Sequence, residues 1–318
     1  MYQFKEEAKF KKCNVPCKDL LDGNKIPSFG LGTLNLKEND AVQVIRSSIE
    51  RGFRLIDTSP VYGNEKAIGN ALKECFDSGL CKREDLFVIS KLWITDRNNA
   101  KDAVRQSLEA LQLDYVDLYL VHYMTPDIVK DSLMVDRVSI QEVWRQLEHC
   151  VEEGLIRSIG LMNCSVIMFL EILTFCNINP TLNCLEMHPY FTQTEAMEFY
   201  KKFKVLLAAY APICPTENLK VGVPEQFKNL DLFKESIIID LAKKYNKTPA
   251  QIILNWHMTQ EHIVFPGMRS VEEIEQNAGV FDFELSSEEI EKISSLNRCA
   301  RFYDRIQDDN FSFIPYWM

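Results

Sequence analysis

Short runs of apolar residues alternate along the chain with longer segments whose apolar positions recur every three or four residues. The short runs are rich in β-branched and aromatic residues and predict strands, whereas the longer segments predict amphipathic helices. Several runs are apolar almost throughout, as in strands covered on both faces. The predicted strands span residues 28–32, 53–57, 86–91, 115–122, 156–161, 182–187, 205–210 and 262–266. The predicted helices span residues 39–51, 65–76, 100–111, 140–153, 165–175, 194–203, 232–245 and 271–277.

Eight strand–helix units in succession, with no second block of different composition, predict an α/β fold, a (β/α)8 barrel forming one domain over residues 1–318. Before the first unit, Asp22-Gly23-Asn24 is a turn signal for a hairpin that would close the bottom of the barrel. After the last unit, a capped helix is expected to begin in the sequence LSSEE at residues 285–289. We expect an N-terminal arm over about residues 1–12 and an aromatic tail over about residues 298–318.

Composition narrows the class of protein. With 318 residues, of which 46% are hydrophobic, the chain can bury a large core, which excludes a disordered or coiled-coil protein. The formal net charge of −10 argues against nucleic acid or a membrane surface as a partner. The ten cysteines are scattered without the spacing of a zinc site, and no signal peptide or membrane span is expected. We therefore expect a cytoplasmic monomer or weak dimer that holds no metal.

Four polar residues fall at the ends of predicted strands. Asp57 ends the second strand, Tyr62 follows in its loop, Lys91 ends the third strand and His122 ends the fourth. Active sites of such barrels lie on the face formed by these strand ends. A single histidine or lysine at such a place is more often structural or solvated. Four such residues on three consecutive strand ends indicate a chemical site.

These residue types suit proton transfer to an oxygen. Tyrosine has a pKa near 10, and a neighbouring ammonium such as Lys91 is expected to lower it toward the working range. Asp57 would hold the ammonium in place and keep it charged. His122 would orient a substrate oxygen. The predicted site thus donates a proton from Tyr62 to an oxygen whose carbon gains a hydride.

Several segments resemble motifs of the aldo-keto reductase family: GFRLIDTSPVYGNEKAIGNAL, DLFVISKLW and LDYVDLYLVH. GLGT, EEGLIRSIG, LEMHPY and VFDFELSSEEI also recur in the family's order, so the resemblance covers about residues 24–297. The resemblance implies the (β/α)8 barrel and a catalytic tetrad of Asp57, Tyr62, Lys91 and His122. It also implies NADPH as the usual cofactor, an aldehyde or ketone as the substrate, and Tyr62 as the general acid.

The positions that the resemblance assigns to the nicotinamide differ partly from the family pattern. The family's Ser-Asn pair after the fifth strand is Met162-Asn163 here, and its glutamine after the sixth strand is Cys184. Tyr210, which in the family stacks beneath the nicotinamide ring, is present, but Ala211 replaces the serine that follows it. Each lost hydrogen bond would weaken binding by roughly 1 kcal/mol.

The phosphate end differs as well. Gly267-Met268 replaces the family's lysine-serine, and Glu273 replaces an arginine that pairs with the 2′-phosphate. Arg269 offers a replacement charge, and Asn277 is kept. Two hypotheses stay open: tolerated drift with NADPH still used, or an altered preference in which NADH is used or a nucleotide binds weakly or not at all. The predicted cofactor-binding residues are Thr33, Asp57, Asn163, Cys184, Tyr210, Met268, Arg269 and Asn277.

The predicted substrate pocket also departs from the family. Leu34 replaces a common tryptophan after GLGT, Tyr123 replaces the tryptophan after His122, and Trp93 is kept. In the tail, Phe311 and Trp317 are assigned to the pocket. These aromatic residues either line its mouth, as the family's C-terminal loop does, or pack the tail onto the barrel.

Three functions are weighed. The first is NAD(P)H-dependent reduction of a small-molecule aldehyde or ketone. The second uses the same barrel and the same acid–base groups for isomerisation or elimination, without a hydride. The third is a binding or structural protein. The presence of all four predicted catalytic residues disfavours this third function. A titration with NADPH and with NADH, followed by fluorescence, separates the first from the second.

Overall fold

Eight parallel strands close on themselves in the computed structural model, which describes residues 12–125, 128–129, 134–135, 137–214 and 225–303. Two parallel bridges, Phe29 with Val264 and Gly32 with Gly267, join the first strand to the last. We call this junction between the first and last strands the seam of the barrel. A Cβ atom at Gly32 would overlap the carbonyl oxygen of Phe265, so the seam requires glycine at position 32. The (β/α)8 prediction is confirmed. The strands, in sheet order, are β3 (Gly30–Gly32), β4 (Leu55–Asp57), β5 (Phe87–Leu92), β6 (Val116–Val121), β9 (Ile156–Met162), β10 (Leu182–Glu186), β11 (Leu206–Tyr210) and β12 (Ile263–Val264).

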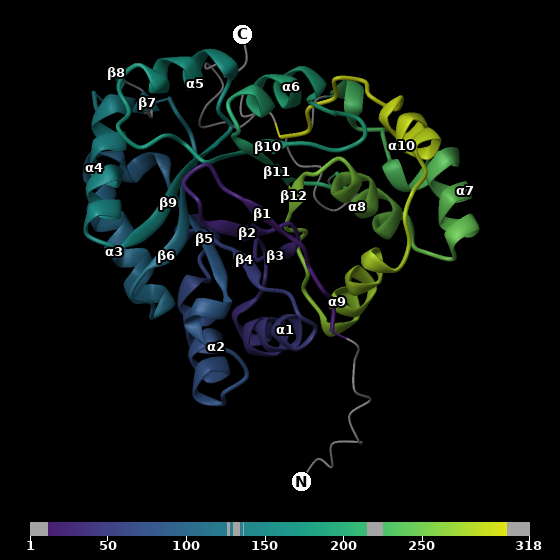
Figure 1. Ribbon diagram of the computed structural model, residues 1–318, viewed down its shortest axis with the longest axis horizontal. Coiled ribbons are helices and arrows are strands. Elements are labelled where there is room, and N and C mark those ends of the chain that lie inside the picture. The colour runs from purple at the N-terminus through teal and green to yellow at the C-terminus, as the bar shows by residue number, and fades with distance from the viewer. Residues whose placement is uncertain (1–11, 126–127, 130–133, 136, 215–224, 304–318) are drawn as a thin grey trace.

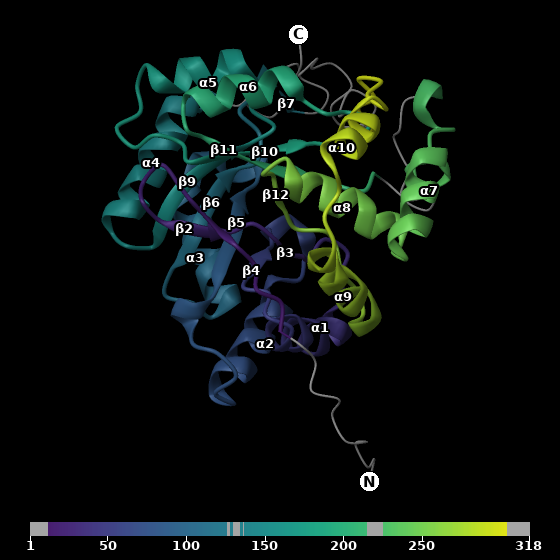
Figure 2. The same ribbon diagram turned by 45° about the vertical axis from the view of Figure 1, so that its right-hand side comes forward.

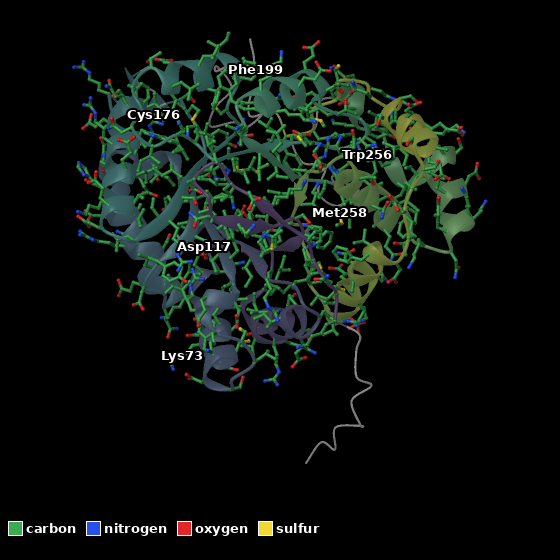
Figure 3. The ribbon with its side chains drawn as sticks, viewed as in Figure 1. Lys73, Asp117, Cys176, Phe199, Trp256 and Met258 are labelled. Atoms are coloured by element: carbon green, nitrogen blue, oxygen red, sulfur yellow. The ribbon has the colours of Figure 1, made fainter. Side chains whose placement is uncertain are left out.

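The helices surround the strands, as Figure 1 shows. Lys73 lies at the outer edge of this ring, whereas Asp117 of β6 lies inside it (Figure 3), buried and ion-paired to Arg83 at 2.7 Å. Among the described residues, no helix is both long and apolar enough to cross a membrane. The helices are α1 (Glu38–Glu50), α2 (Glu65–Asp77), α3 (Ala100–Leu111), α4 (Ile140–Glu152), α5 (Val166–Leu173), α6 (Thr194–Lys202), α7 (Ser236–Tyr245), α8 (Pro249–Thr259), α9 (Val271–Ala278) and α10 (Ser287–Ser294).

The sequence analysis missed helix α8. This helix lies between the barrel and α7 (Figure 2) and is buried from residue 251 to 257, so it has no solvent-exposed face, and its polar residues Gln251 and Asn255 are buried as well. Its start is nevertheless marked, because the Thr248 and Gln251 side chains form a capping box. The predicted helix over 232–245 is also shorter than expected. Glu235 adopts an extended conformation and separates a 3-10 turn from α7.

The predicted hairpin closes the bottom of the barrel. Its strands β1 (Cys17–Asp19) and β2 (Lys25–Pro27) pair antiparallel and cross the centre of the ring in Figure 1. Leu20 and Ile26 belong to the same buried cluster as side chains from seven of the barrel strands and from Phe265. Ser158 of β9 donates a hydrogen bond of 2.6 Å to Asp22 in the turn. A smaller antiparallel pair, β7 (Ile128–Val129) and β8 (Met134–Val135), lies in the loop after β6.

Candidate active site

A buried ion pair lies at the centre of the site. Lys91 on β5 donates through Nζ to Asp57 Oδ1 at 2.6 Å and to the carbonyl oxygen of Thr58 at 2.7 Å. Lys91 is wholly buried and Asp57 is 3% exposed. Burial alone would lower the pKa of the Lys91 ammonium, but Asp57 and Tyr62 more than offset this and raise it above its usual range. Lys91 therefore stays charged.

Tyr62 faces this pair from the loop after β4. It ends a 3-10 turn over Pro60–Tyr62, which Gly63 closes with a left-handed φ of 71°. The Lys91 Nζ atom lies 4.8 Å from the centre of the Tyr62 ring. Burial raises the pKa of Tyr62 to about 12, although Lys91 acts in the opposite direction. The expectation that Lys91 brings this pKa toward neutrality is therefore wrong in this structure, and the hydroxyl stays protonated as a donor.

His122 directly follows β6 and lies among aromatic rings. Its imidazole meets Trp93 edge to face, with centroids 4.8 Å apart, and stacks on Tyr123 at 4.9 Å. Its backbone N–H donates to the carbonyl oxygen of Leu92 at 3.2 Å, next to Lys91. The structure thus brings the predicted substrate-pocket residues Trp93 and Tyr123 to the same end of the barrel as the four predicted catalytic residues.

Two residues assigned to the nicotinamide are joined to His122. The Tyr210 hydroxyl donates to Asn163 Oδ1 at 2.8 Å, and Asn163 Nδ2 donates to the carbonyl oxygen of His122 at 3.2 Å. Asn163 has a left-handed φ of 57°, which asparagine adopts more readily than most residues. These bonds leave one N–H and one lone pair of the Asn163 amide for a ligand.

Thr33 and Cys184, two further predicted cofactor-binding residues, are wholly buried. The Thr33 hydroxyl donates to the carbonyl oxygen of Asp57 at 2.9 Å. Asn64, which sequence reasoning missed, is buried and donates to the carbonyl oxygen of Thr33 at 2.8 Å, tying the loops after β3 and β4 together. Cys184 is wholly buried, and burial raises the pKa of its thiol, so it stays neutral. A neutral thiol is a weaker hydrogen-bonding group than the family's amide.

The phosphate-end residues lie just before α9 or on it. Met268 is wholly buried in the core, so its side chain faces away from solvent. Arg269 is exposed, and no carboxylate in the described part of the chain lies within ion-pair distance of its guanidinium. Its backbone N–H donates to Glu273 Oε2 at 2.7 Å, which holds that carboxylate in place. Asn277 is 8% exposed on the same helix.

Of the remaining predicted pocket residues, one lies among the described residues and two lie outside them. Leu34 is 48% exposed beside Thr33, whereas Phe311 and Trp317 lie outside the described residues. The structure instead brings Tyr303 to the site, with its ring 6.0 Å from that of Tyr210. The sequence analysis singled out tail aromatic residues only beyond this point, and no local pattern marks Tyr303.

Comparison with known proteins gives a consistent result. Residues 28–298 match the Aldo/keto reductase family. Aldose reductase C of Dictyostelium discoideum is 37% identical over 300 residues, which cover 89% of each chain. NADP-dependent D-sorbitol-6-phosphate dehydrogenase of Malus domestica is 34% identical over 89% of this chain and 94% of its own. NAD(P)H-dependent D-xylose reductase of Candida tenuis is 33% identical over 93% of this chain and 98% of its own.

Proposed function

This chain belongs to the aldo/keto reductase family and is an oxidoreductase that uses a nicotinamide cofactor, and we propose that it reduces an aldehyde or ketone with Tyr62 as the general acid. One observation carries the proposal. The buried Lys91 ammonium is bonded to Asp57 at 2.6 Å and faces the Tyr62 ring at 4.8 Å. This arrangement places a fixed positive charge next to a hydroxyl that must give up a proton.

In the proposed reaction, each residue of this group has one task. The carbonyl carbon would accept a hydride, which a reduced nicotinamide would supply when bound. The Tyr62 O–H bond breaks, and its proton moves to the carbonyl oxygen, completing the alcohol. The Lys91 charge stabilises the phenolate that is left, and Asp57 holds Lys91. His122, fixed by Trp93 and Tyr123, orients the carbonyl oxygen.

The residues present fit a nicotinamide nucleotide, but they would bind its 2′-phosphate only weakly. Tyr210, fixed through Asn163, offers a ring on which the nicotinamide would lie. Arg269 is the exposed cation at the start of α9, while Glu273 is a fixed negative charge one helical turn away. Opposite charges near the start of the same helix partly cancel at a bound 2′-phosphate. We therefore propose that NADPH binds with only weak discrimination against NADH.

The test is direct. The purified chain is mixed with NADPH or NADH and a panel of small aldehydes and ketones, and the loss of reduced-nucleotide absorbance is followed. Consumption that depends on the carbonyl compound is expected with both nucleotides. Binding of neither nucleotide would remove the proposal and favour proton-transfer chemistry on the same residues.

A further inference from the structure

A carboxylate at the end of β10 holds the chain that enters the C-terminal tail. Glu186 is the last residue of β10 and pairs in register with Tyr210 of β11. Its Oε1 atom accepts a hydrogen bond from the backbone N–H of Phe302 at 2.6 Å, and its Oε2 atom accepts one from that of Tyr303 at 3.0 Å. Two residues more than a hundred positions further along the chain are thus fixed to the strand beside the site.

The Glu186 carboxylate is buried and has few partners. It is 2% exposed, and the third group bonded to it is His188 Nε2 at 3.0 Å. Among the described residues, no lysine or arginine lies within ion-pair distance of Glu186. A buried carboxylate without a lysine or arginine partner is costly unless other donors satisfy it, and two of its donors are the backbone N–H groups of residues 302 and 303.

The two anchored side chains point to different places. Phe302 is 2% exposed and packs in a buried cluster with Tyr190 and other residues. Tyr303 is 38% exposed, and its ring meets that of Tyr210 at 69°, with centroids 6.0 Å apart. Tyr210 in turn bonds Asn163, which bonds the backbone of the catalytic histidine. A continuous line of contacts therefore runs from Glu186 to the reacting end of the site.

We propose that Glu186 is a positioning residue that keeps the Tyr303 ring against Tyr210 and so forms one wall of the nicotinamide site. This inference rests on the proposed function, because that proposal gives Tyr210 its role. The wall would hold the Tyr210 ring in place before a nucleotide binds. Ordering a binding surface in advance improves affinity, because less freedom is lost on binding.

The experiment compares two buried carboxylates. Glu186→Gln keeps the size of the side chain but replaces one acceptor oxygen with an NH2 group, which opposes a backbone N–H. Glu148→Gln is the matched control. Glu148 is 5% exposed and accepts from the backbone N–H groups of Asn177 at 2.6 Å and Ile178 at 2.8 Å, in the loop that precedes β10. Both variants should unfold at a lower temperature than the wild type.

Only one variant should change the site. Fluorescence titration with NADPH should show roughly three- to tenfold weaker binding for Glu186→Gln, the range that loss of one aromatic contact predicts. Tyr303→Ala should show the same loss, and the double variant should bind no more weakly than either single variant, because both act through one contact. Glu148→Gln should bind as the wild type does.

The results that overturn the proposal are distinct. Wild-type affinity in Glu186→Gln together with a lower unfolding temperature would make Glu186 a structural residue only. Losses that add in the double variant would show that it does not act through Tyr303. Nucleotide binding by the wild type without any carbonyl reduction would overturn the proposed reaction and leave this inference standing. Failure of the wild type to bind either nucleotide would overturn both.

Discussion

At the catalytic end of the candidate site the charges are buried and paired, whereas at the phosphate end they are exposed. Lys91 and Asp57 lie inside the barrel, where losing either one leaves the other charged and unsolvated. Arg269 and Glu273 lie in solvent at the start of α9, where a change of charge costs the fold little. This difference explains how the charged pair Lys91–Asp57 can be kept inside the barrel while the charges at the phosphate end change.

The largest effect should come from the catalytic end. Tyr62→Phe removes the proton donor and keeps the ring, so carbonyl turnover should fall by roughly 10³-fold, within the range for loss of a general acid. NADPH affinity, measured by fluorescence titration, should stay at the wild-type value. Turnover within a few-fold of the wild type would remove Tyr62 from the mechanism.

Lys91→Met should lower both activity and stability. Turnover should fall by roughly 10²-fold, and the alkaline limb of its pH profile should move to higher pH, because the Lys91 charge no longer lowers the pKa of Tyr62. Chemical denaturation should show a loss of about 3–5 kcal/mol at neutral pH. Burial raises the pKa of Asp57, so the stability of the variant should fall as pH rises. An unchanged profile with normal rates would show that Lys91 is structural.

At the phosphate end a change should improve discrimination. Gly267→Lys with Glu273→Arg should raise the preference for NADPH over NADH at least tenfold, since each new charge-assisted contact contributes about 1.5–3 kcal/mol. Position 267 accepts a side chain, because nothing lies within 4 Å of a Cβ placed there. The ratio of the two dissociation constants is the measurement. Glu273→Gln, which removes only the repulsion, should give a smaller gain, and no gain in the double variant would place the 2′-phosphate elsewhere.

The smallest expected effect is that of Arg269→Ala. It should weaken NADPH binding about tenfold and leave NADH binding unchanged, because only the 2′-phosphate loses a partner. Two titrations, repeated at higher salt, measure this effect, and the wild-type preference should shrink as salt rises. A wild-type preference for NADPH of several hundred-fold would contradict the proposal that the 2′-phosphate is bound only weakly.

The strands and the positions at their ends could be predicted because apolar runs and polar ends leave local patterns. Lys91 and His122 were placed at the correct end of the barrel in this way. Helix α8 was missed because it is buried and has no solvent-exposed face, and the break at Glu235 depends on packing that no local pattern records. Tertiary contacts decide such cases.

The residues of the candidate site could be predicted from the sequence, but their burial and their long-range contacts could not. The strand-end positions and the family resemblance both indicated the four candidate catalytic residues, and the direction of the Lys91 effect on Tyr62 followed from charge. How deeply Tyr62 is buried could not be foreseen, and burial decides the sign of the net pKa change. The bonds from Glu186 to residues 302 and 303 join positions too far apart for any local pattern to reveal.

The seam between Phe29 and Val264 sets the order in which the barrel can assemble. During synthesis, the first strand leaves the ribosome long before the last one exists, so an early chain carries two open sheet edges. Closure waits for a contact of very long sequence separation, which is the slow kind of folding event. A chain that stops before residue 264 would keep these edges exposed and should aggregate, even though all four candidate catalytic residues have already been made.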